Sequence, residues 1–441
     1  MLKVGLYTLG CKVSLYETEA VGEAFVREGF EIAPFDERCD VYVINTCTVT
    51  AESDAKSRKY IRRAIRKNPD AVVIVIGCYS QRAPGEVAAI EGVSAVIGTQ
   101  DKLSAVEIAK RMISGKNAER RMQNAELAEN YVSALEGAAF EPMCIENAPR
   151  TRAYVKIEDG CECRCTYCAI SGARGPVRSK APCDVIAEVE NLYKKGTLEI
   201  VLTGIETGSY GADFDEKYDL ADLLAELDGR QSCGRIRLGS MAPELLSRSF
   251  VERVKDLAIL VPHYHVSMQS GSDSVLRAMK RRYNRKMALD NIAYIRECNP
   301  RVMLTADLMV GFPGESEEDF ADTVKFVRQA RLLDAHVFAY SKREGTPAAE
   351  YDDQVPEDVK KRRSAELIKV CHLVRDEVLA EVVERGEELS CILESRKGST
   401  YTAHSDSYIE VSCEGEDGLS GQLVSVKPIS HKNGVIDGKI I

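Results

Sequence analysis

The sequence predicts an α/β protein built from three folded parts. Apolar strand-like runs alternate with helical patterns near the N-terminus, a longer series of the same kind follows, and short strands separated by glycines close the chain. These patterns indicate an open α/β domain, a central series of βα units and a small all-β barrel. The predicted boundaries are 1–113 for the first domain, 114–147 for a connector, 148–378 for the central part and 379–441 for the barrel.

The totals are those of an ordinary globular protein. Of the 441 residues, 44% are hydrophobic and 29% are charged. No apolar run approaches the roughly 18 residues of a membrane-spanning helix, and Met1–Gly10 lacks the regions of a signal peptide. We therefore expect a cytoplasmic protein without a membrane partner. A net charge of −10 argues against a surface that coats nucleic acid, but allows a local basic patch.

Fifteen cysteines are many for a cytoplasmic protein. Disulfides are rare in that compartment, so metal binding or redox chemistry explains a clustered subset better. We expect the scattered cysteines to be small buried hydrophobic residues. These are Cys39, Cys144, Cys183, Cys233, Cys298, Cys371, Cys391 and Cys413.

In the N-terminal domain a cysteine follows each of three apolar runs. The runs are Val4–Leu9, Val41–Ile44 and Val72–Ile76, and they predict buried parallel strands. The cysteines are Cys11, Cys47 and Cys78. Loops at the carboxyl ends of parallel strands converge on one crevice, so the three thiols are predicted to meet in space. Any one of them alone fits core packing better.

A basic helix is predicted at Glu52–Lys67, between the second and third strands. Its cations fall in two rows with i, i+4 spacing and form one positive face. They are Arg58, Lys59, Arg62, Arg63, Arg66 and Lys67. A solvated face and a contact with a polyanion both fit this pattern.

The connector is polar and helix-leaning, and the central part alternates strands and helices. The predicted strands are Ala153–Ile157, Glu199–Leu202, Arg235–Leu238, His265–Met268, Met303–Met309 and Ala335–Ala339. The predicted helices are Cys183–Lys195, Leu220–Leu227, Glu244–Lys255, Met287–Glu297 and Glu317–Ala330. Such βα repeats imply a parallel sheet, either open or curled into a barrel, with the loops after the strands forming the active face.

The loop after the first of these strands, Gly160–Ile170, carries three cysteines spaced C-x3-C-x2-C. Cys161, Cys165 and Cys168 could hold three corners of a cubane iron–sulfur cluster and leave its fourth iron open for chemistry. A structural zinc knuckle is the alternative. Cys163 is an extra thiol inside the loop, and the three-ligand pattern of the N-terminal set favours reading it as a bystander.

Polar residues cluster at the ends of the other central strands. They include Thr203 to Glu206, Gln269 to Ser272, and Asp307. Asp307 lies in an apolar run, where an unpaired carboxylate is costly; a structural cap or ion pair is the alternative role. His263 and His265 fit packed, hydrogen-bonded histidines better than metal ligands. A second basic run, Lys280–Lys286, fits either a solvated loop or a phosphate contact.

The short strands predicted after about Leu379 read as a small barrel. They are Leu389–Glu394, Tyr408–Val411, Gln422–Lys427 and Asn433–Lys439. Acidic residues outnumber basic ones from Glu381 onward, which does not suit a simple RNA-grasping barrel.

The motifs together resemble the methylthiotransferases of the radical S-adenosylmethionine superfamily. The resemblance covers essentially the whole chain and rests on T-L-G-C-K-V, N-T-C-T-V-T, G-C-Y-S-Q, the cysteine loop, L-T-G-I-E-T-G-S-Y-G, M-Q-S-G-S-D-S-V-L and Y-S-K-R-E-G-T-P. It implies a partial (β/α) radical-SAM barrel and a C-terminal TRAM barrel. Ser14-Leu15 and the A-I-S-G at Ala169–Gly172 depart from the family pattern, but all six ligand cysteines are intact.

The resemblance also implies cofactors and partners. Two [4Fe–4S] clusters are implied: one on Cys161, Cys165 and Cys168 that binds S-adenosylmethionine and cleaves it to a radical, and an auxiliary one on Cys11, Cys47 and Cys78 that carries the transferred sulfur. Thr203, Gly204 and Glu206 match the position that contacts the amino group of S-adenosylmethionine in relatives. Gln269 and Asp307 are candidates for contacts with its ribose or methionine part. No catalytic side chain is assigned. The implied partners are a tRNA anticodon stem-loop, held by the two basic runs, an external electron donor and a sulfur donor.

Within the family, the motifs are most similar to the branch that methylthiolates carbon 2 of N6-threonylcarbamoyladenosine in tRNA. Isopentenyl-adenosine in tRNA and an aspartate of a ribosomal protein are the alternative substrates. Two alternatives come from other classes: an iron–sulfur redox or electron-transfer protein, and an RNA-binding module with structural zinc.

Overall fold

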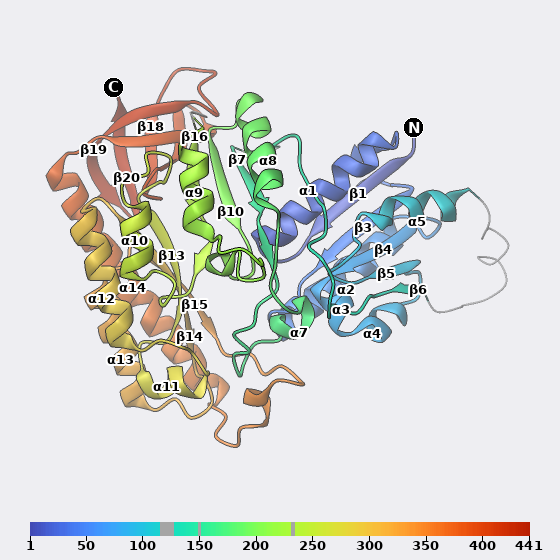
Figure 1. The fold of residues 1–441 in the computed structure, drawn as a ribbon, viewed down its shortest axis with the longest axis horizontal. Helices are drawn as coiled ribbons and strands as arrows, with labels where there is room; N and C mark the ends of the chain where they lie inside the picture. The colour runs from blue at the N-terminus through green and yellow to red at the C-terminus, as the bar shows by residue number, and fades with distance from the viewer. Residues whose placement is uncertain (115–127, 149–150, 231–233) are drawn as a thin grey trace.

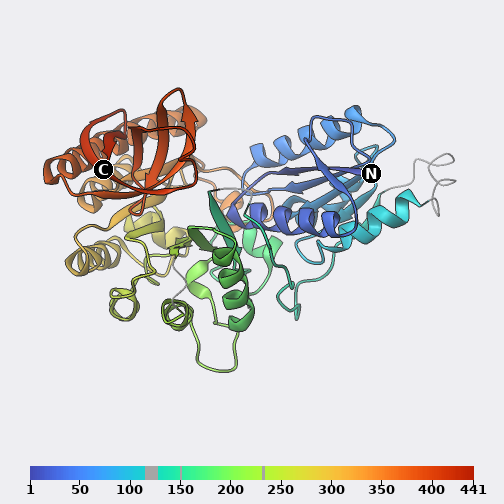
Figure 2. The same ribbon diagram turned by 90° about the horizontal axis from the view of Figure 1, so that it is seen from above.

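The computed structural model describes residues 1–114, 128–148, 151–230 and 234–441. The N-terminal sheet and the C-terminal barrel flank a central set of strands, with a row of helices along the outer side of that set (Figures 1 and 2). No helix of the described residues is both long and apolar enough to cross a membrane.

The N-terminal part is a six-stranded parallel sheet with the order β2-β1-β3-β4-β5-β6. Its strands are β1 (Lys3–Thr8), β2 (Glu31–Ala33), β3 (Val41–Thr46), β4 (Val72–Gly77), β5 (Ala95–Ile97) and β6 (Glu129–Tyr131). Its helices are α1 (Lys12–Arg27), α2 (Ala51–Lys67), α3 (Cys78–Arg82), α4 (Pro84–Ala88) and α5 (Ser104–Ile113). Every residue of β3 and β4 is buried, as in parallel sheets covered on both faces. The three predicted strands and the basic helix are confirmed.

The segment expected as a helix-leaning connector contains a strand instead. β6 pairs in parallel with β5 and extends the N-terminal sheet. The apolar pattern of E-N-Y is too short to reveal this pairing, which the edge of β5 supplies. Residues 115–127 of the connector lie outside the described part of the chain.

The central part forms two parallel sheets, ordered β7-β10-β11 and β12-β13-β14-β15. Its strands are β7 (Arg152–Lys156), β10 (Glu199–Thr203), β11 (Arg235–Leu238), β12 (Ser240–Met241), β13 (His263–Gln269), β14 (Met303–Val310) and β15 (Asp334–Ala339), and a small antiparallel pair is formed by β8 (Glu158–Asp159) and β9 (Arg178–Ser179). An isolated parallel bridge pairs Ile236 of β11 with Leu260, three residues before β13 begins. β7 and β15 are edge strands of the two sheets, and they do not pair with each other among the described residues. The central part is therefore a partial barrel and not a closed one. All six predicted strands are confirmed.

The helices of the central part follow the strands in βα order. They are α7 (Ile170–Arg174), α8 (Pro182–Lys194), α9 (Leu220–Asp228), α10 (Arg248–Val254), α11 (Asp273–Ala278), α12 (Arg285–Cys298), α13 (Glu317–Ala330) and α14 (Glu357–Arg385), with short 3-10 turns at Thr207–Ser209 and Pro347–Glu350. α10 begins four residues later than the predicted Glu244, because Ser247 caps it by accepting a hydrogen bond from the amide of Phe250.

The C-terminal part is a closed five-stranded barrel ordered β16-β17-β18-β20-β19. Its strands are β16 (Leu389–Lys397), β17 (Thr400–Ser405), β18 (Glu410–Glu414), β19 (Leu423–Lys432) and β20 (Val435–Ile440). The barrel starts later than the expected residue 379, since α14 continues to Arg385. β17 was not predicted, because its T-Y-T-A-H-S sequence buries only small or polar residues besides Tyr401.

Polar contacts fasten the outer parts to the central one. Arg343 donates to the Asp54 carboxylate at 2.5 Å and to the Thr48 hydroxyl at 2.8 Å, which ties the central part to the N-terminal sheet. Arg152 forms an ion pair with Glu394 of the C-terminal barrel. These buried contacts fix the three parts around a shared interior.

Candidate active site

The first cysteine site is the loop between β8 and α7. Gly160 opens it with φ +91°, and a Cβ there would lie 1.9 Å from the carbonyl oxygen of Pro176, so only glycine fits. Cys165 is buried, and Cys161 and Cys168 are half-buried. The amide of Ile170 donates to the sulfur of Cys168 at 3.3 Å. Thiols that already accept hydrogen bonds suit anionic ligands, which such donors stabilise.

An arginine from a distant element completes the loop site. Arg281 donates to the sulfur of Cys165 at 3.2 Å and to the backbone carbonyl of Ser267 at 3.2 Å. Its guanidinium also lies over the ring of Tyr283, 4.9 Å from the centroid. A fixed positive charge is therefore held against one thiol of the loop.

The extra thiol of the loop is not isolated from the other three. Cys161 and Cys163 are hydrogen-bonded, and this bond lowers the pKa of Cys163 to about 6. Cys163 therefore lies beside Cys161, and its reading as a bystander stays a prediction.

The second cysteine set lies at the carboxyl ends of three neighbouring strands. Cys11 directly precedes α1, Cys47 follows β3, and Cys78 begins α3 directly after β4. Because β1, β3 and β4 are adjacent and parallel, these ends lie side by side. Burial raises the pKa of Cys78 to about 12, and the neighbouring Cys11 and Cys47 add to the rise. The strand order thus brings together residues that are distant in sequence.

The donor chemistry of both sets fits an iron–sulfur cluster, because Cys thiolates are the usual ligands of such clusters. Among the described residues, no three Cys, His, Asp or Glu side chains form a group that could hold one metal ion. A cubane cluster attaches each thiolate to a different iron, so its ligands need not meet at one point. Three cysteines per set, without a histidine or carboxylate among them, match that requirement.

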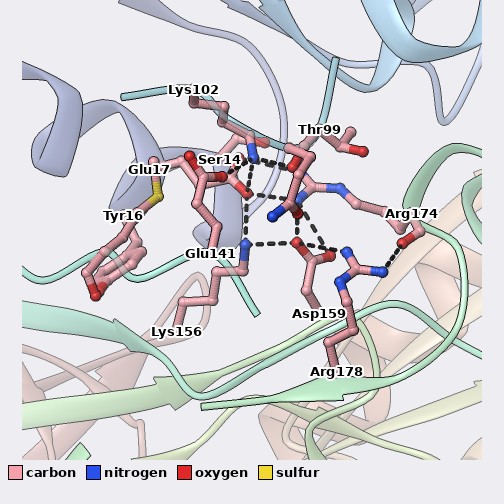
Figure 3. Close-up of polar contacts among 12 residues, drawn as sticks. Ser14, Tyr16, Glu17, Thr99, Lys102, Glu141, Lys156, Asp159, Arg174 and Arg178 are labelled. Carbon is pink, nitrogen blue, oxygen red and sulfur yellow. Dashed lines mark hydrogen bonds and ion pairs between the residues drawn. The ribbon is translucent and has the colours of Figure 1, made fainter. Parts of the chain in front are cut away.

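A fully buried network of charged side chains joins the N-terminal part to the central part (Figure 3). Arg174 of α7 donates to Glu17 of α1 at 2.5 Å and to Asp159 of β8 at 3.1 Å. Lys156 of β7 donates to the same two carboxylates, at 2.9 and 2.6 Å. Lys102 adds an ion pair to Glu17 at 3.2 Å. These side chains come from both the N-terminal and the central part, so the network locks the two together.

Arg174 and Asp159 connect this network to the cysteines themselves. Arg174 donates through Nε to the sulfur of Cys78 at 3.1 Å. Asp159 accepts a hydrogen bond at 2.9 Å from the amide of Gly160, the residue before Cys161. Burial opposes the ionisation of Glu17, but Arg174 and the two lysines outweigh it and lower its pKa well below the usual range. The network is therefore an assembly of charged groups that continues from one cysteine site to the other.

One of the predicted cofactor residues, Glu206, lies close to the loop thiols Cys161 and Cys163. Glu206 is 5% exposed, and its carboxylate accepts a hydrogen bond from the amide of Ala242 at 3.1 Å. Burial raises the pKa of Glu206 to about 8. Gln269 ends β13 with φ +64°, a strained conformation for a residue with a side chain, of the kind found at functional sites.

The other three predicted cofactor residues, Thr203, Gly204 and Asp307, line a separate cavity of about 470 Å³. Cys11 and Lys12 form part of the wall, and the C-terminal barrel contributes Tyr408 and neighbouring residues. All three parts of the chain therefore meet at this cavity. Glu206 and Gln269 are not among its lining residues, and the assignment of all five residues to S-adenosylmethionine stays a prediction.

A chain of hydrogen bonds runs along the cavity wall. Thr305 links His263 and His265, with its hydroxyl 3.0 Å and 2.8 Å from their ring nitrogens. Asp307 lies 3.2 Å from His265 and 3.3 Å from His336. Burial disfavours the charge of Asp307, but hydrogen bonds from the two histidines outweigh it and lower its pKa. The prediction that His263 and His265 are packed and hydrogen-bonded is confirmed.

Sequence reasoning missed the charged residues that hold the two sites. Arg174, Glu17 and Lys102 stand alone in helical or loop sequence, and no spacing rule connects them. Arg281 was visible only as part of the basic run Lys280–Lys286, which was weighed as a phosphate contact. In the structure, Arg281 and Tyr283 of that run turn inward, whereas Arg282 and Lys286 are exposed, so a phosphate contact of the run stays a prediction.

The basic helix keeps much of its predicted face. Lys59, Arg62, Arg66 and Lys67 are exposed. The other two cations are held by neighbours: Arg58 donates to the hydroxyl of Tyr79 at 2.9 Å, and Arg63 pairs with Asp36 at 2.5 Å. The helix that follows Cys47, α2, therefore presents four exposed cations that form no ion pair within the described part of the chain.

The prediction for the scattered cysteines is correct in part. Cys39, Cys371, Cys391 and Cys413 are buried, and Cys298 is half-buried. Cys144 and Cys183 are exposed, so the prediction of burial is wrong for them. Both lie in polar surface segments whose apolar neighbours carry the packing. Cys233 falls outside the described residues.

Two family models match the chain, one on each side of the connector. Residues 155–327 match the Radical SAM superfamily, and residues 3–98 match a family described as Uncharacterized protein family UPF0004. A solved radical S-adenosylmethionine methyltransferase, TsrM from Kitasatospora setae, has a similar fold. Its TM-score is 0.57 at 18% identity, covering 79% of this chain and 75% of that one.

Curated relatives match over nearly the full length. The threonylcarbamoyladenosine tRNA methylthiotransferase MtaB of Bacillus subtilis is 39% identical, over 97% of this chain and 94% of the relative. The protein of the same name from Aquifex aeolicus is 34% identical, over 96% of this chain and 100% of the relative. A tRNA-2-methylthio-N(6)-dimethylallyladenosine synthase of Desulfitobacterium hafniense is 34% identical over 83% of this chain and 81% of the relative.

Proposed function

The chain belongs to the radical S-adenosylmethionine methylthiotransferases, and from this premise we propose that it converts N6-threonylcarbamoyladenosine in tRNA to its 2-methylthio derivative. The observation that carries the proposal is the 39% identity to an MtaB relative over 97% of the chain. The substrate is the adenosine next to the anticodon, and the reaction replaces the hydrogen on carbon 2 with a methylthio group.

We assign the two cysteine sets to two [4Fe–4S] clusters. Cys161, Cys165 and Cys168 hold one, and the strand-end set of Cys11, Cys47 and Cys78 holds the other. When bound, the first supplies the electron that cleaves S-adenosylmethionine, and the second carries the sulfur. An external electron donor and a sulfur donor complete the reaction. The chemistry of both donor sets and the hydrogen bonds onto Cys78, Cys165 and Cys168 support this assignment.

The protein's own residues hold and orient the reactants. Glu206, buried beside the loop site, offers a carboxylate to the amino group of S-adenosylmethionine; an ammonium partner would stabilise its ionised form. Gln269 is placed at the same strand ends to contact the rest of that molecule. Thr203, Gly204 and Asp307, which were also predicted to contact S-adenosylmethionine, face the neighbouring cavity that Cys11 lines.

The exposed cations of α2 suit the phosphates of the tRNA anticodon stem-loop. Lys59, Arg62, Arg66 and Lys67 present positive charge on the helix that follows Cys47. Phosphate contacts of this kind make binding depend on salt. The run Lys280–Lys286 adds fewer charges than expected, because part of it is buried.

Mass spectrometry of tRNA nucleosides from cells lacking the protein tests the proposal. We expect 2-methylthio-N6-threonylcarbamoyladenosine to disappear, N6-threonylcarbamoyladenosine to accumulate, and a plasmid copy of the gene to reverse both changes. The relatives named as dimethylallyladenosine synthases make isopentenyl-adenosine the second candidate substrate. Loss of its methylthio product alone would overturn the proposed substrate and leave the reaction class in place.

A further inference from the structure

The cavity shared by the three parts contains hydrogen-bond donors that no described residue satisfies. Arg237 is 1% exposed and binds Glu199 through Nε at 2.9 Å and Nη2 at 3.0 Å. Its Nη1 is buried and has no hydrogen-bond partner among the described residues. His263, 3% exposed, is bonded to Thr305 through Nε2, and its Nδ1 also lacks a partner there. Both residues line the cavity.

These two side chains lie next to each other. Tyr408 of the C-terminal barrel stacks on His263 with 4.7 Å between ring centroids, and the Arg237 guanidinium lies 5.1 Å from the same tyrosine ring. Leaving a buried polar group unsatisfied costs about 1–3 kcal/mol, and more for a charged group. A ligand that accepts hydrogen bonds at this wall would remove that cost.

The carboxylates that line the cavity cannot satisfy these donors. Asp307 is engaged by His265 and His336. Asp334 pairs with Arg375 at 3.7 Å, and Glu410 is exposed on β18. The wall is therefore richer in free donors than in free acceptors.

Lys12 adds a positive charge to the same wall. It is half-buried, lines the cavity, and makes no hydrogen bond or ion pair with any described residue. It is also the first residue of α1, a 16-residue helix with no acidic residue in its first turn and no side-chain cap from Cys11. The unpaired amides of such a helix start favour an anion. The Lys12 ammonium, the N-terminus of α1 and the Arg237 Nη1, which has no hydrogen-bond partner among the described residues, therefore lie at one cavity.

We propose that this cavity binds the carboxylate of the substrate's N6 substituent, with Lys12 and Arg237 as the recognising cations. The inference rests on the proposed function, because the threonylcarbamoyl group carries a carboxylate and the isopentenyl group does not. In adenine, carbon 2 and the N6-bearing carbon both flank N1, so a substituent on N6 lies beside the reacting carbon. Cys11 of the proposed sulfur-carrying set lines the same wall, next to Lys12 in the chain. Lys12 and Arg237 are thereby specificity-determining residues.

S-adenosylmethionine also carries a carboxylate and is the other possible source of this group. The lining residues favour the tRNA substituent, because Cys11 and Lys12 belong to the cavity while the loop thiols and Glu206 do not. A direct measurement of S-adenosylmethionine binding separates the two sources.

Lys12 is the residue to change, because it has no hydrogen bond or ion pair with a described residue. Its replacement therefore leaves no other side chain of that part without a partner. The holoenzyme is assayed on two anticodon stem-loop RNAs: one carries N6-threonylcarbamoyladenosine, and the other its neutral methyl amide. The wild type should modify the acid about 10- to 100-fold more efficiently in kcat/KM than the amide. Lys12→Gln should lose most of that preference, because its kcat/KM falls for the acid RNA and stays the same for the amide RNA. Lys12→Arg should retain the preference. Lys325→Gln, which removes an exposed lysine on α13, is the matched control and should behave as the wild type.

Binding of S-adenosylmethionine, measured by titration without RNA, should be the same in the wild type and Lys12→Gln. The inference is overturned if the wild type has the same kcat/KM for the acid and the amide RNA, or if Lys12→Gln lowers kcat/KM equally for both RNAs. It is also overturned if the affinity of Lys12→Gln for S-adenosylmethionine falls together with its activity. A wild type that modifies isopentenyl-adenosine RNA but not the threonylcarbamoyl RNA overturns the proposed substrate instead. The two failures are therefore distinguishable.

Discussion

The two cysteine sites are built in opposite ways. The loop site takes three thiols from one short segment, Cys161 to Cys168, and adds a distant arginine, Arg281. The strand-end site takes single thiols from three separate loops and depends on the order of β1, β3 and β4. The first is encoded locally and the second by topology. A local site needs little besides its loop, whereas a topological site needs the whole domain to be held in register.

The largest difference should appear when one thiol is removed from each site. Cys165→Ser is expected to abolish both cleavage of S-adenosylmethionine and methylthiolation. Cys47→Ser should abolish methylthiolation only, because the radical-forming loop remains whole. Chromatography of 5′-deoxyadenosine and of modified nucleosides measures the two activities. Cys183→Ser, at an exposed thiol on α8, is the control and should preserve both.

The same contrast explains what could be predicted from the sequence. The six cysteines stand out because they follow apolar strands, such as β4, which is apolar throughout, and β3, which is apolar over Val41–Ile44. Glu17, Lys102 and Arg174 could not be found in this way, since their partners are brought together by packing between two domains. β6 and β17 were missed because pairing partners, and not their own residues, make them strands.

The buried network should make the strand-end site the more fragile of the two. Arg174→Met removes one of the two cations that Glu17 and Asp159 share and leaves them with Lys156, which costs about 3–5 kcal/mol of stability because both carboxylates are buried. Arg281→Met removes a hydrogen bond to Cys165 but strands no carboxylate, so the expected loss is about 1–3 kcal/mol. Thermal unfolding midpoints of the two variants, both without clusters, measure the difference. Equal shifts would show that the network contributes no more than a single donor.

The two sites should also respond to pH in opposite directions. The pKa of Glu206 is raised to about 8 in the folded chain, so between about pH 5 and 8 the folded state holds a proton that the unfolded state has lost. Stability from this group therefore falls as the pH rises through that range. The pKa of Asp159 in the network is lowered to about 2, because Arg174 and Lys156 outweigh its burial, so its contribution is lost only in acid.

Glu206→Gln isolates the first of these effects. Its stability relative to the wild type should increase from pH 5 to pH 8, by on the order of 1–3 kcal/mol. Chemical unfolding at a series of pH values gives this difference. A constant difference across the range would mean that Glu206 does not titrate there.

The smallest expected effect concerns RNA binding beside the strand-end site. Changing both Arg62 and Arg66 to Gln removes two exposed charges of α2 and should weaken tRNA binding several-fold at moderate salt. The slope of log affinity against log salt should fall in magnitude by up to about 2. Cleavage of S-adenosylmethionine without tRNA should not change. An unchanged slope would place the tRNA on another surface.

The central claim is that each cysteine set holds its own cluster and has its own role. Iron analysis and cleavage of S-adenosylmethionine, measured together on anaerobically reconstituted protein, test it most directly. We expect about eight irons per chain in the wild type and about four when either Cys11, Cys47 and Cys78 or Cys161, Cys165 and Cys168 are all changed to Ala. Only the first triple variant should still cleave S-adenosylmethionine. About four irons in the wild type, or loss of all iron in either triple variant, would contradict two independent sites.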